Sequence, residues 1–284
     1  MFENEYRSPL NECVRFVADC KKEYVIDDTP YILGPEEKAF KITENRIFPL
    51  PKCNDFRKLG FVDGGNAPLI KSSDFTICIN RVAGVVANKT GIKELQSTPH
   101  IVEFYSATVL NSGKDETLEI VTKFFPREPS FREYLPESAI VLNISDPSIR
   151  NASGFLMKIE VIAGIARRFA EWTYATKFIE NELNEGDIFV RDGSLQTGFT
   201  GEVEAARSLY KTGLTNKIYI TGLSKTCRLF TKNGDSLISI INEIALKKFQ
   251  NQSWYYHPIF RITKADNQAD LYFAKFHKTS PYPF

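Results

Sequence analysis

The chain has 284 residues, of which 43% are hydrophobic and 25% are charged, values typical of a soluble globular protein. Its 36 basic and 35 acidic side chains leave a formal charge of +1, which excludes a polybasic, histone-like binder and restricts any nucleic-acid contact to local patches. The five cysteines form no CxxC pair, so neither a zinc site nor a disulfide framework is expected. No secretory signal pattern and no apolar run of about 18 residues is visible, which predicts a cytoplasmic protein without membrane contact.

The first 55 residues predict one helix followed by an irregular extension. Ser8 and Pro9 are helix-start residues, and the segment from Leu10 to Lys22 has apolar residues on one side. The segment from Asp27 to Lys52 is rich in proline and charge, which predicts irregular structure.

Residues 56–125 predict a β-meander. The apolar residues of FVDGG form its first strand, ending at Asp63. Further strands are predicted over residues 75–79, 82–86, 101–110 and 118–125. The loop 111–116, with Gly113 at its turn, joins the last two strands as a hairpin. Residues 126–153 contain four prolines and predict a crossing loop or an inserted flap.

Residues 154–284 switch to alternating helices and strands. Apolar residues recur every three or four positions over residues 154–183, which predicts a long helix with Glu160, Arg167, Glu171 and Tyr174 on its polar side. Gly186 ends this helix before a buried strand that leads to Asp192. The remaining predicted elements are helices at 202–211 and 236–249, and strands at 217–221, 259–263 and 271–276.

This order predicts a single mixed α/β domain over residues 1–284. A central mixed sheet with flanking helices fits a ribonuclease H-like core, in which an acid on the first strand meets acids from later elements. The loop or flap at 126–153 is an additional β/loop insertion.

Two aspartates follow apolar strands at distant points of the sequence. Asp63 precedes Gly64 and Gly65, and Asp192 precedes Gly193 in VRDGSLQTG. One strand that ends in Asp-Gly is often only a turn. Two of them supply the oxygen ligands from which a fold can assemble a divalent-metal site.

Two basic residues at strand ends are candidates for a phosphate contact. Lys225 lies in GLSKT and can act as a point charge, or it is a solvated surface lysine. His277 follows the strand at 271–276 between two lysines, and a lone histidine is also commonly structural. The alternation of this strand predicts Tyr272, Ala274 and Phe276 on one face, with Lys275 and His277 on the other.

In this order, FVDGG, the helix containing Glu171-Trp172, VRDGSLQTG, GLSKT and YFAKFH resemble the NurA nuclease family from about Asp63 to the C-terminus. The resemblance implies a ribonuclease H-like fold and Mn²⁺- or Mg²⁺-dependent cleavage of single- and double-stranded DNA. It also implies 5′ to 3′ exonuclease and single-strand endonuclease activity in DNA end resection and double-strand break repair. The implied assembly is a homodimer that docks on a HerA-type hexameric ATPase.

The resemblance assigns roles to individual residues. Asp63 matches the first acidic position and Asp192 the acid of the DG motif. Glu171 is the best match for the glutamate of the preceding helix, so these three residues are the implied metal ligands. Lys225 and His277 are the implied phosphate contacts.

Alternatives remain open for several of these assignments. Glu160 competes with Glu171, whose carboxylate could instead form a salt bridge with Arg167 or Arg168. Tyr272 is a candidate for the family's C-terminal tyrosine.

Two other function classes also remain open. Strand-end DxG turns hold nucleotide phosphates in phosphotransferases of the actin-like or sugar-kinase type. A non-catalytic DNA-binding adaptor would keep the fold without the metal. The chain has no GxxxxGK[ST] loop, so any ATPase activity would come from a partner.

Overall fold

The computed structural model describes residues 7–20, 30–31, 37–39, 41–52, 57–113, 117–231, 234–262, 269–280 and 283–284. The chain divides into two compact units, one formed by Cys53–Lys225 and the other by Met1–Lys52 with Thr226–Phe284. The single-domain boundary stays a prediction. Within the described residues, no helix is long and apolar enough to cross a membrane.

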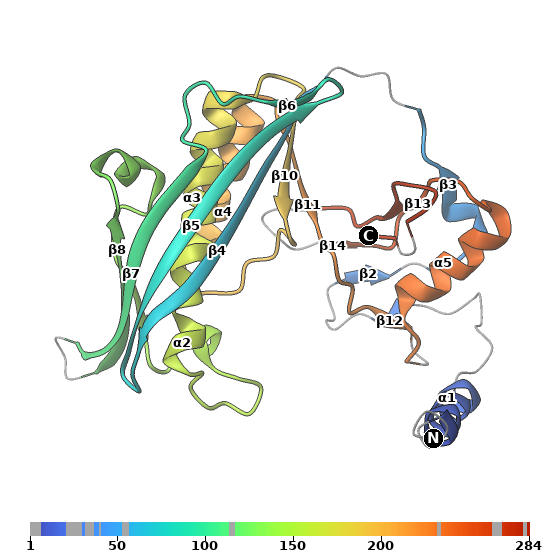
Figure 1. Ribbon diagram of the computed structural model, residues 1–284, viewed down its shortest axis with the longest axis horizontal. Coiled ribbons are helices and arrows are strands. Elements are labelled where there is room, and N and C mark those ends of the chain that lie inside the picture. Colours follow the sequence, from blue (N-terminus) through green and yellow to red (C-terminus); the bar gives the residue numbers. More distant parts are fainter. Residues whose placement is uncertain are drawn as a thin grey trace. The chain divides into compact units, whose positions relative to one another are not determined.

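The unit of residues 53–225 is built on one curled, mixed sheet (Figure 1). Its strands are β4 (Leu59–Lys71), β5 (Phe75–Asn88), β6 (Gly91–Lys93), β7 (Ile101–Ser112), β8 (Leu118–Pro126), β9 (Ile140–Asn143), β10 (Ile188–Asp192) and β11 (Tyr219–Leu223). The spatial order is β11-β10-β4-β5-β7-β8-β9, with β6 paired to β5. Strands β4, β5, β7, β8 and β9 form an antiparallel meander, whereas β10 and β11 run parallel to β4. The sequence-based prediction of a mixed α/β fold is therefore confirmed.

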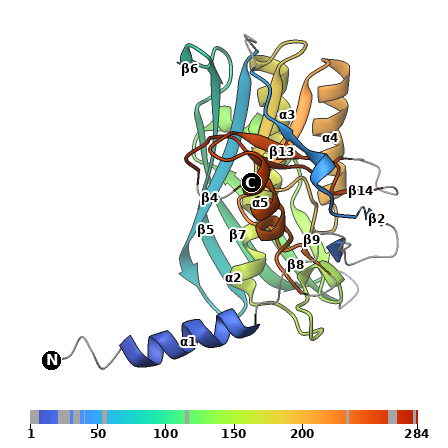
Figure 2. The same ribbon diagram turned by 90° about the vertical axis from the view of Figure 1, so that its right-hand side faces the viewer.

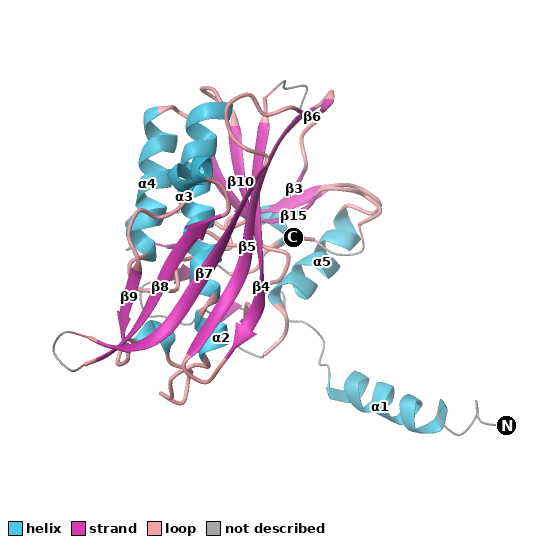
Figure 3. Cartoon of the chain, turned by 60° about the vertical axis from the view of Figure 1, so that its left-hand side comes forward, coloured by secondary structure: helices cyan, strands magenta, loops and turns pink. Residues whose placement is uncertain are grey.

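Helices of this unit cover one face of its sheet (Figure 3). They are α2 (Ile159–Ile162), α3 (Gly164–Glu182) and α4 (Glu202–Thr215), and two 3-10 helices lie at Pro129–Tyr134 and Pro147–Ile149. The apolar side of α3 packs Trp172, Tyr174 and Phe178 into the core, where all three are fully buried. Such burial contributes about 2–3 kcal/mol for each aromatic side chain.

The opposite face of the sheet, called the open face below, carries the alternate side chains of the same strands. Burial alternates along β5, β7 and β8, so every second residue is covered by the helices and the residues between them face the open side. The large apolar residues exposed on the open face include Phe61, Val85, Ile101, Tyr105, Val109, Phe125, Val141 and Tyr219.

Strand glycines allow α3 to lie close to the sheet. A Cβ atom at Gly60 would lie 2.6 Å from Phe178, and one at Gly84 would lie 2.7 Å from both Phe178 and the Tyr174 hydroxyl. A glycine inside a strand often marks such a close approach.

The second unit is a smaller α/β assembly. It contains α1 (Arg7–Cys20), α5 (Leu237–Lys248), a 3-10 helix (Glu44–Arg46) and the strands β1 (Pro30–Tyr31), β2 (Glu37–Ala39), β3 (Ile47–Pro49), β12 (Phe230–Thr231), β13 (Trp254–Tyr256), β14 (Phe260–Ile262) and β15 (Phe273–Lys275). The three-stranded sheet β15-β13-β3 shares a core with α5. Strand β13 lies beside α5 in Figure 2. Trp254 and Tyr256 are buried there beside the isoleucines of α5.

Several predicted elements differ from the structure. The segments 75–79 and 82–86 are one strand, β5, because no residue between them turns the chain. Residues 126–153 are more than a loop, since β9 pairs with β8 at the edge of the sheet. The segment Asp27–Lys52 is not wholly irregular in its described part, because it includes β1, β2 and β3.

The predicted helix at 154–183 starts later and is divided. The structure has the short helix α2 from Ile159 and the main helix α3 from Gly164. Glu171 and Tyr174 do not lie on a solvated side, because both are buried under the sheet. The prediction missed this because ion pairs and a hydrogen bond from the Tyr174 hydroxyl to the Pro99 carbonyl satisfy their polar atoms there.

Candidate functional site

Asp63 and Asp192 lie on adjacent strands at nearly the same level. The parallel register of β4 and β10 pairs Val62 with Arg191, and the two aspartates are the next residues on each strand. Adjacent strands lie about 4.8 Å apart. The fold thus brings together two carboxylates that 128 intervening residues separate in the sequence.

The two aspartates occupy different backbone settings. Asp192 ends β10, and Gly193 follows with φ of 109°, so the predicted strand-to-turn transition is present. Asp63 does not end its strand. Gly64 and Gly65 continue β4 and pair with β5, so the prediction that this strand ends at Asp63 is wrong.

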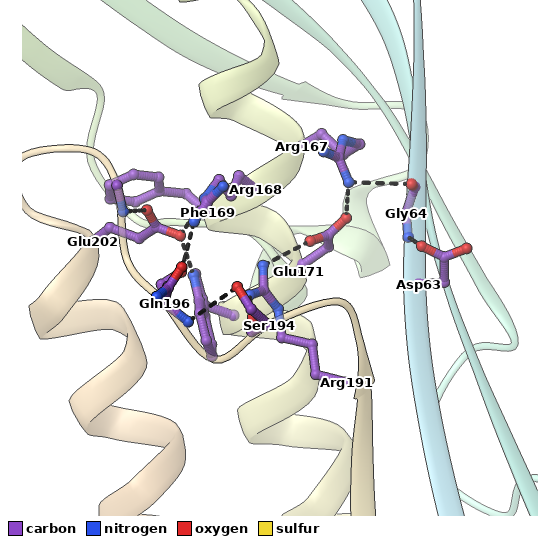
Figure 4. A network of polar contacts seen from close by, with 12 residues as sticks. Asp63, Gly64, Arg167, Arg168, Phe169, Glu171, Arg191, Ser194, Gln196 and Glu202 are labelled. Carbon is purple, nitrogen blue, oxygen red and sulfur yellow. Dashed lines mark hydrogen bonds and ion pairs between the residues drawn. The ribbon is translucent and has the colours of Figure 1, made fainter. Parts of the chain in front are cut away.

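Both aspartates belong to the open face. The neighbouring residues Val62 and Arg191 are buried toward the helices, and side chains alternate along a strand. Asp63 Oδ1 accepts a hydrogen bond from the Gly64 N–H at 2.8 Å. Its carboxylate points away from α3 (Figure 4).

Lys225 lies with the two aspartates. Its Nζ is 2.7 Å from Asp192 Oδ2, and its side chain is exposed. The hydrogen bond and charge of Asp192, together with the charge of Asp63, raise the pKa of Lys225 above its ordinary value. The site therefore combines two carboxylates with a lysine that stays protonated at neutral pH.

Glu171 lies on the opposite side of β4 from the Asp63 carboxylate (Figure 4). Its Oε1 pairs with Arg167 Nη1, and its Oε2 lies 3.2 Å from Arg191 Nη2. A Cβ atom at Gly64 would lie 2.6 Å from Glu171 Oε1, so glycine is what admits this carboxylate beside β4. Burial raises the pKa of Glu171, and the charges of Arg167 and Arg191 oppose that rise.

This geometry agrees with the salt-bridge alternative for Glu171. It does not agree with a carboxylate turned toward the aspartates in the arrangement described, and metal ligation by Glu171 stays a prediction. Within the described residues, no group of three or more His, Cys, Asp and Glu is arranged to hold a metal ion.

The ion pairs of Glu171 connect the two aspartate strands. Arg167 Nη1 also donates to the Gly64 carbonyl at 3.2 Å, one residue after Asp63. Arg191 directly precedes Asp192. One carboxylate on α3 thus holds both strands beside the positions that carry the candidate site.

A second buried carboxylate, Glu202, fixes the loop that follows Asp192. It accepts hydrogen bonds from the Trp172 indole at 2.7 Å and from the N–H groups of Gly198 and Phe199 at 2.6 and 3.1 Å. Arg168 completes the set with an ion pair. Burial alone would raise the pKa of Glu202, but these hydrogen bonds outweigh it and hold the pKa below its ordinary value.

Sequence reasoning missed Glu202 and Arg191 as parts of the site. Arg191 places its guanidinium 4.0 Å from the centre of the Trp172 ring, a cation–π contact inside the core. Two sequence features could have identified them: Arg191 is an arginine within a buried strand pattern, and Glu202 is a glutamate at the first position of a helix after glycine.

The other predicted residues lie elsewhere. Glu160 forms an exposed salt bridge with Lys71 at 3.0 Å.

His277 belongs to the second unit, where its Nδ1 lies 2.7 Å from the Thr279 hydroxyl, and its role at a phosphate stays a prediction. Tyr272 stacks on the His257 ring at 4.0 Å between ring centres. Lys275 is buried, as is Phe273 two residues before it in β15, whereas Ala274 between them is half-buried.

Comparison with known proteins gives one similar structure. No protein-family model matches the chain, and no curated protein matches its sequence. The structure is similar to that of the NurA nuclease from Sulfolobus solfataricus, with a TM-score of 0.43 and 12% identity over 96% of this chain and 77% of that chain.

The lowered pKa of Glu202 predicts a pH-dependent stability difference. Its contribution is present above the ordinary glutamate pKa of about 4.3 and is lost as pH falls through the lower folded-state value. At pH 7, Glu202→Gln should lower the free energy of unfolding by about 2 kcal/mol, because an amide cannot satisfy the same set of donors. Urea unfolding should show this difference shrinking below about pH 4.

The matched control is Glu204→Gln, which changes an exposed carboxylate in the first turn of the same helix. At pH 7 and at pH 3, this variant should have the same free energy of unfolding as the original protein. A Glu202→Gln difference that is the same at pH 7 and pH 3 would show that the carboxylate charge contributes nothing.

Proposed function

We propose that the chain is a divalent-metal-dependent deoxyribonuclease of the NurA type with a ribonuclease H-like core. The supporting observation is the common level of Asp63 and Asp192 on the open face, with Lys225 bound to Asp192. An acid on the first meander strand thereby meets an acid from a later strand, as expected of such a core. The motif resemblance extends the proposal to 5′ to 3′ exonuclease and single-strand endonuclease activity in DNA end resection.

The donor set fits a hard cation. Mg²⁺ commonly binds through one or two carboxylates, retained waters and substrate phosphates, and Mn²⁺ accepts the same ligands. Asp63 and Asp192 would hold such an ion, which when bound supplies Lewis-acid polarisation of the phosphate. If Glu171 were also to bind the ion, its carboxylate would have to leave Arg167 and Arg191. Breaking a buried ion pair costs about 3–5 kcal/mol.

The chain's own residues supply the remaining chemistry. Lys225 stays protonated and can neutralise charge on a phosphate oxygen near Asp192. Glu171, Arg167 and Arg191 keep the strands of Asp63 and Asp192 level. These groups position the site without touching the substrate.

The first functional prediction concerns the aspartates. Asp63→Asn and Asp192→Asn should each reduce cleavage of labelled linear DNA at least about 100-fold, because a neutral amide is a poor ligand for Mg²⁺ or Mn²⁺. Gel assays with linear and circular DNA, in each metal and in EDTA, measure the effect.

The control is Asp74→Asn, the same substitution in the turn between β4 and β5, where Asp74 accepts a hydrogen bond from Ser72. Activity that needs no metal, or that survives both site substitutions while Asp74→Asn behaves normally, would rule out this site.

The second functional prediction separates phosphate contact from metal binding. Lys225→Ala should slow cleavage about 100-fold, because a charge near the scissile phosphate is lost, while Mn²⁺ affinity measured by calorimetry stays nearly unchanged. His277→Ala is expected to act in the same direction.

Lys217→Ala is the matched control for Lys225. Lys217 is an equally exposed lysine paired to Glu185 at 2.8 Å, and it lies before the start of β11 whereas Lys225 follows its end. Equal cleavage rates for Lys225→Ala, His277→Ala and this control would remove both residues from the proposed site.

A non-catalytic DNA-binding adaptor is the second candidate function. It is favoured by the absence, among the described residues, of a group of three acidic or histidine ligands. DNA binding that is unaffected by metal and not accompanied by cleavage would select it. The phosphotransferase alternative is weakened, because Gly64 and Gly65 form strand rather than a phosphate-holding turn.

The proposal includes a homodimer that works with a HerA-type hexameric ATPase. Helix α1 supports a partner contact, since its apolar side chains Leu10, Val14, Phe16 and Val17 are all more than half exposed. Val14→Ser with Phe16→Ser should weaken that contact, because less apolar surface is buried, whereas Glu12→Gln should not. Light scattering and co-sedimentation with such an ATPase are the measurements, and a monomer that binds no ATPase would end this part of the proposal.

A further inference from the structure

The open face presents aromatic rings beside the candidate site. Tyr105 on β7 and Phe125 on β8 are directly opposite in the strand register, and they are 41% and 49% exposed. Cross-strand neighbours on one face lie about 5 Å apart, so the two rings form one surface. Phe61 on β4 adds a third exposed ring on the same face.

Two arginines lie between the pair of Tyr105 and Phe125 and the aspartates. The register of the sheet aligns Gly65, Arg81 and Glu103 across β4, β5 and β7, and Arg127 also pairs with Glu103. The arginine side chains are 64% and 59% exposed, whereas that of Glu103 is only 14% exposed. Hydrogen bonds from both arginines hold the pKa of Glu103 below its ordinary value, so one carboxylate orients two guanidinium groups and leaves a net positive charge.

The rows of the open face follow one another in a fixed order. A row here means the residues that pair side by side across the strands. The row of Asp63 comes first, the row of Arg81 is two residues away along β5, and the row of Tyr105 is two residues beyond that. Each step is about 6.7 Å along a strand. Lys123 lies exposed one further row away on β8.

We propose that the open face is a platform for single-stranded DNA, on which Tyr105 and Phe125 stack bases while Arg81 and Arg127 contact phosphates. This inference rests on the proposed function in one respect, that the strand then continues to the aspartates for cleavage. Aromatic stacking combined with a cationic track is how sequence-tolerant proteins bind single strands.

Charge and ring exposure favour this occupant over other surfaces. The core of a protein–protein interface is depleted of charged residues, whereas here three charged side chains cross the middle of the face. Duplex DNA keeps its bases stacked inside the helix, so exposed rings gain a partner only from unpaired bases.

The test measures binding without cleavage. Fluorescence anisotropy of a labelled oligothymidylate of about 20 nucleotides is recorded in EDTA with the full chain, so that the result does not depend on nuclease activity. Tyr105→Ala with Phe125→Ala should weaken binding about tenfold or more, because stacking on each base is lost. A blunt-ended hairpin duplex should show no such change.

Matched variants separate the two kinds of contact. Phe155→Ala removes a more exposed ring from a loop outside the sheet and should leave the affinity unchanged. Arg81→Gln with Arg127→Gln should reduce the slope of log affinity against log salt by about 1.4, because two phosphate contacts are lost. Glu103→Gln keeps both arginines, removes a negative charge and should tighten binding.

Each outcome decides the proposal. Unchanged single-strand affinity in both double variants overturns the platform and leaves the metal-dependent nuclease untouched. Light scattering that shows the aromatic double variant converting a dimer to a monomer, with unchanged DNA affinity, assigns the face to a second copy and also overturns it. Weaker single-strand binding in variants that still cleave a dinucleotide substrate supports it.

Discussion

The close approach of α3 to β4 is the constraint on which the candidate site depends. Gly60, Gly64 and Gly84 carry no Cβ atom toward the helix, so Phe178 and Glu171 occupy the space at these three positions. Glu171 then reaches Arg167 and Arg191, which lie beside the strands of the two aspartates. A side chain at Gly64 would displace the carboxylate, and the link between the strands would be lost.

The sheet divides structural and chemical tasks between its two faces. On the helix face, the ion pairs of Glu171 and Glu202 offset the desolvation of buried charge, because each carboxylate is met by an arginine and by further donors. On the open face, Asp63, Asp192 and Lys225 remain accessible to a ligand. Residues that alternate along the same strands therefore serve stability on one side and the proposed chemistry on the other.

Local sequence patterns predicted much of the fold. The apolar runs ending at Asp63 and Asp192, the hairpin of β7 and β8, and the helices α4 and α5 are short-range features, and each appears in the structure near its predicted position. The sequence missed β9 and β13 because their strand character comes from pairing with β8 and with β3 and β15. The predicted strand also ended too early, at Asp63, since a glycine inside a strand resembles one at its end until the helix that requires it is known.

By itself, the sequence determined the mixed α/β class and singled out the two aspartates and Lys225, because strand ends and glycine turns are encoded over a few residues. Only the tertiary structure decided which side chains meet. The parallel register of β4 and β10 places Asp63 and Asp192 at the same level of the sheet. Because side chains alternate along β4, Asp63 lies on the open face, whereas Gly64 faces Glu171 on the helix side. Neither the register of a strand nor the face of the sheet on which a side chain lies is a local property, because both depend on pairing with partners more than a hundred residues away.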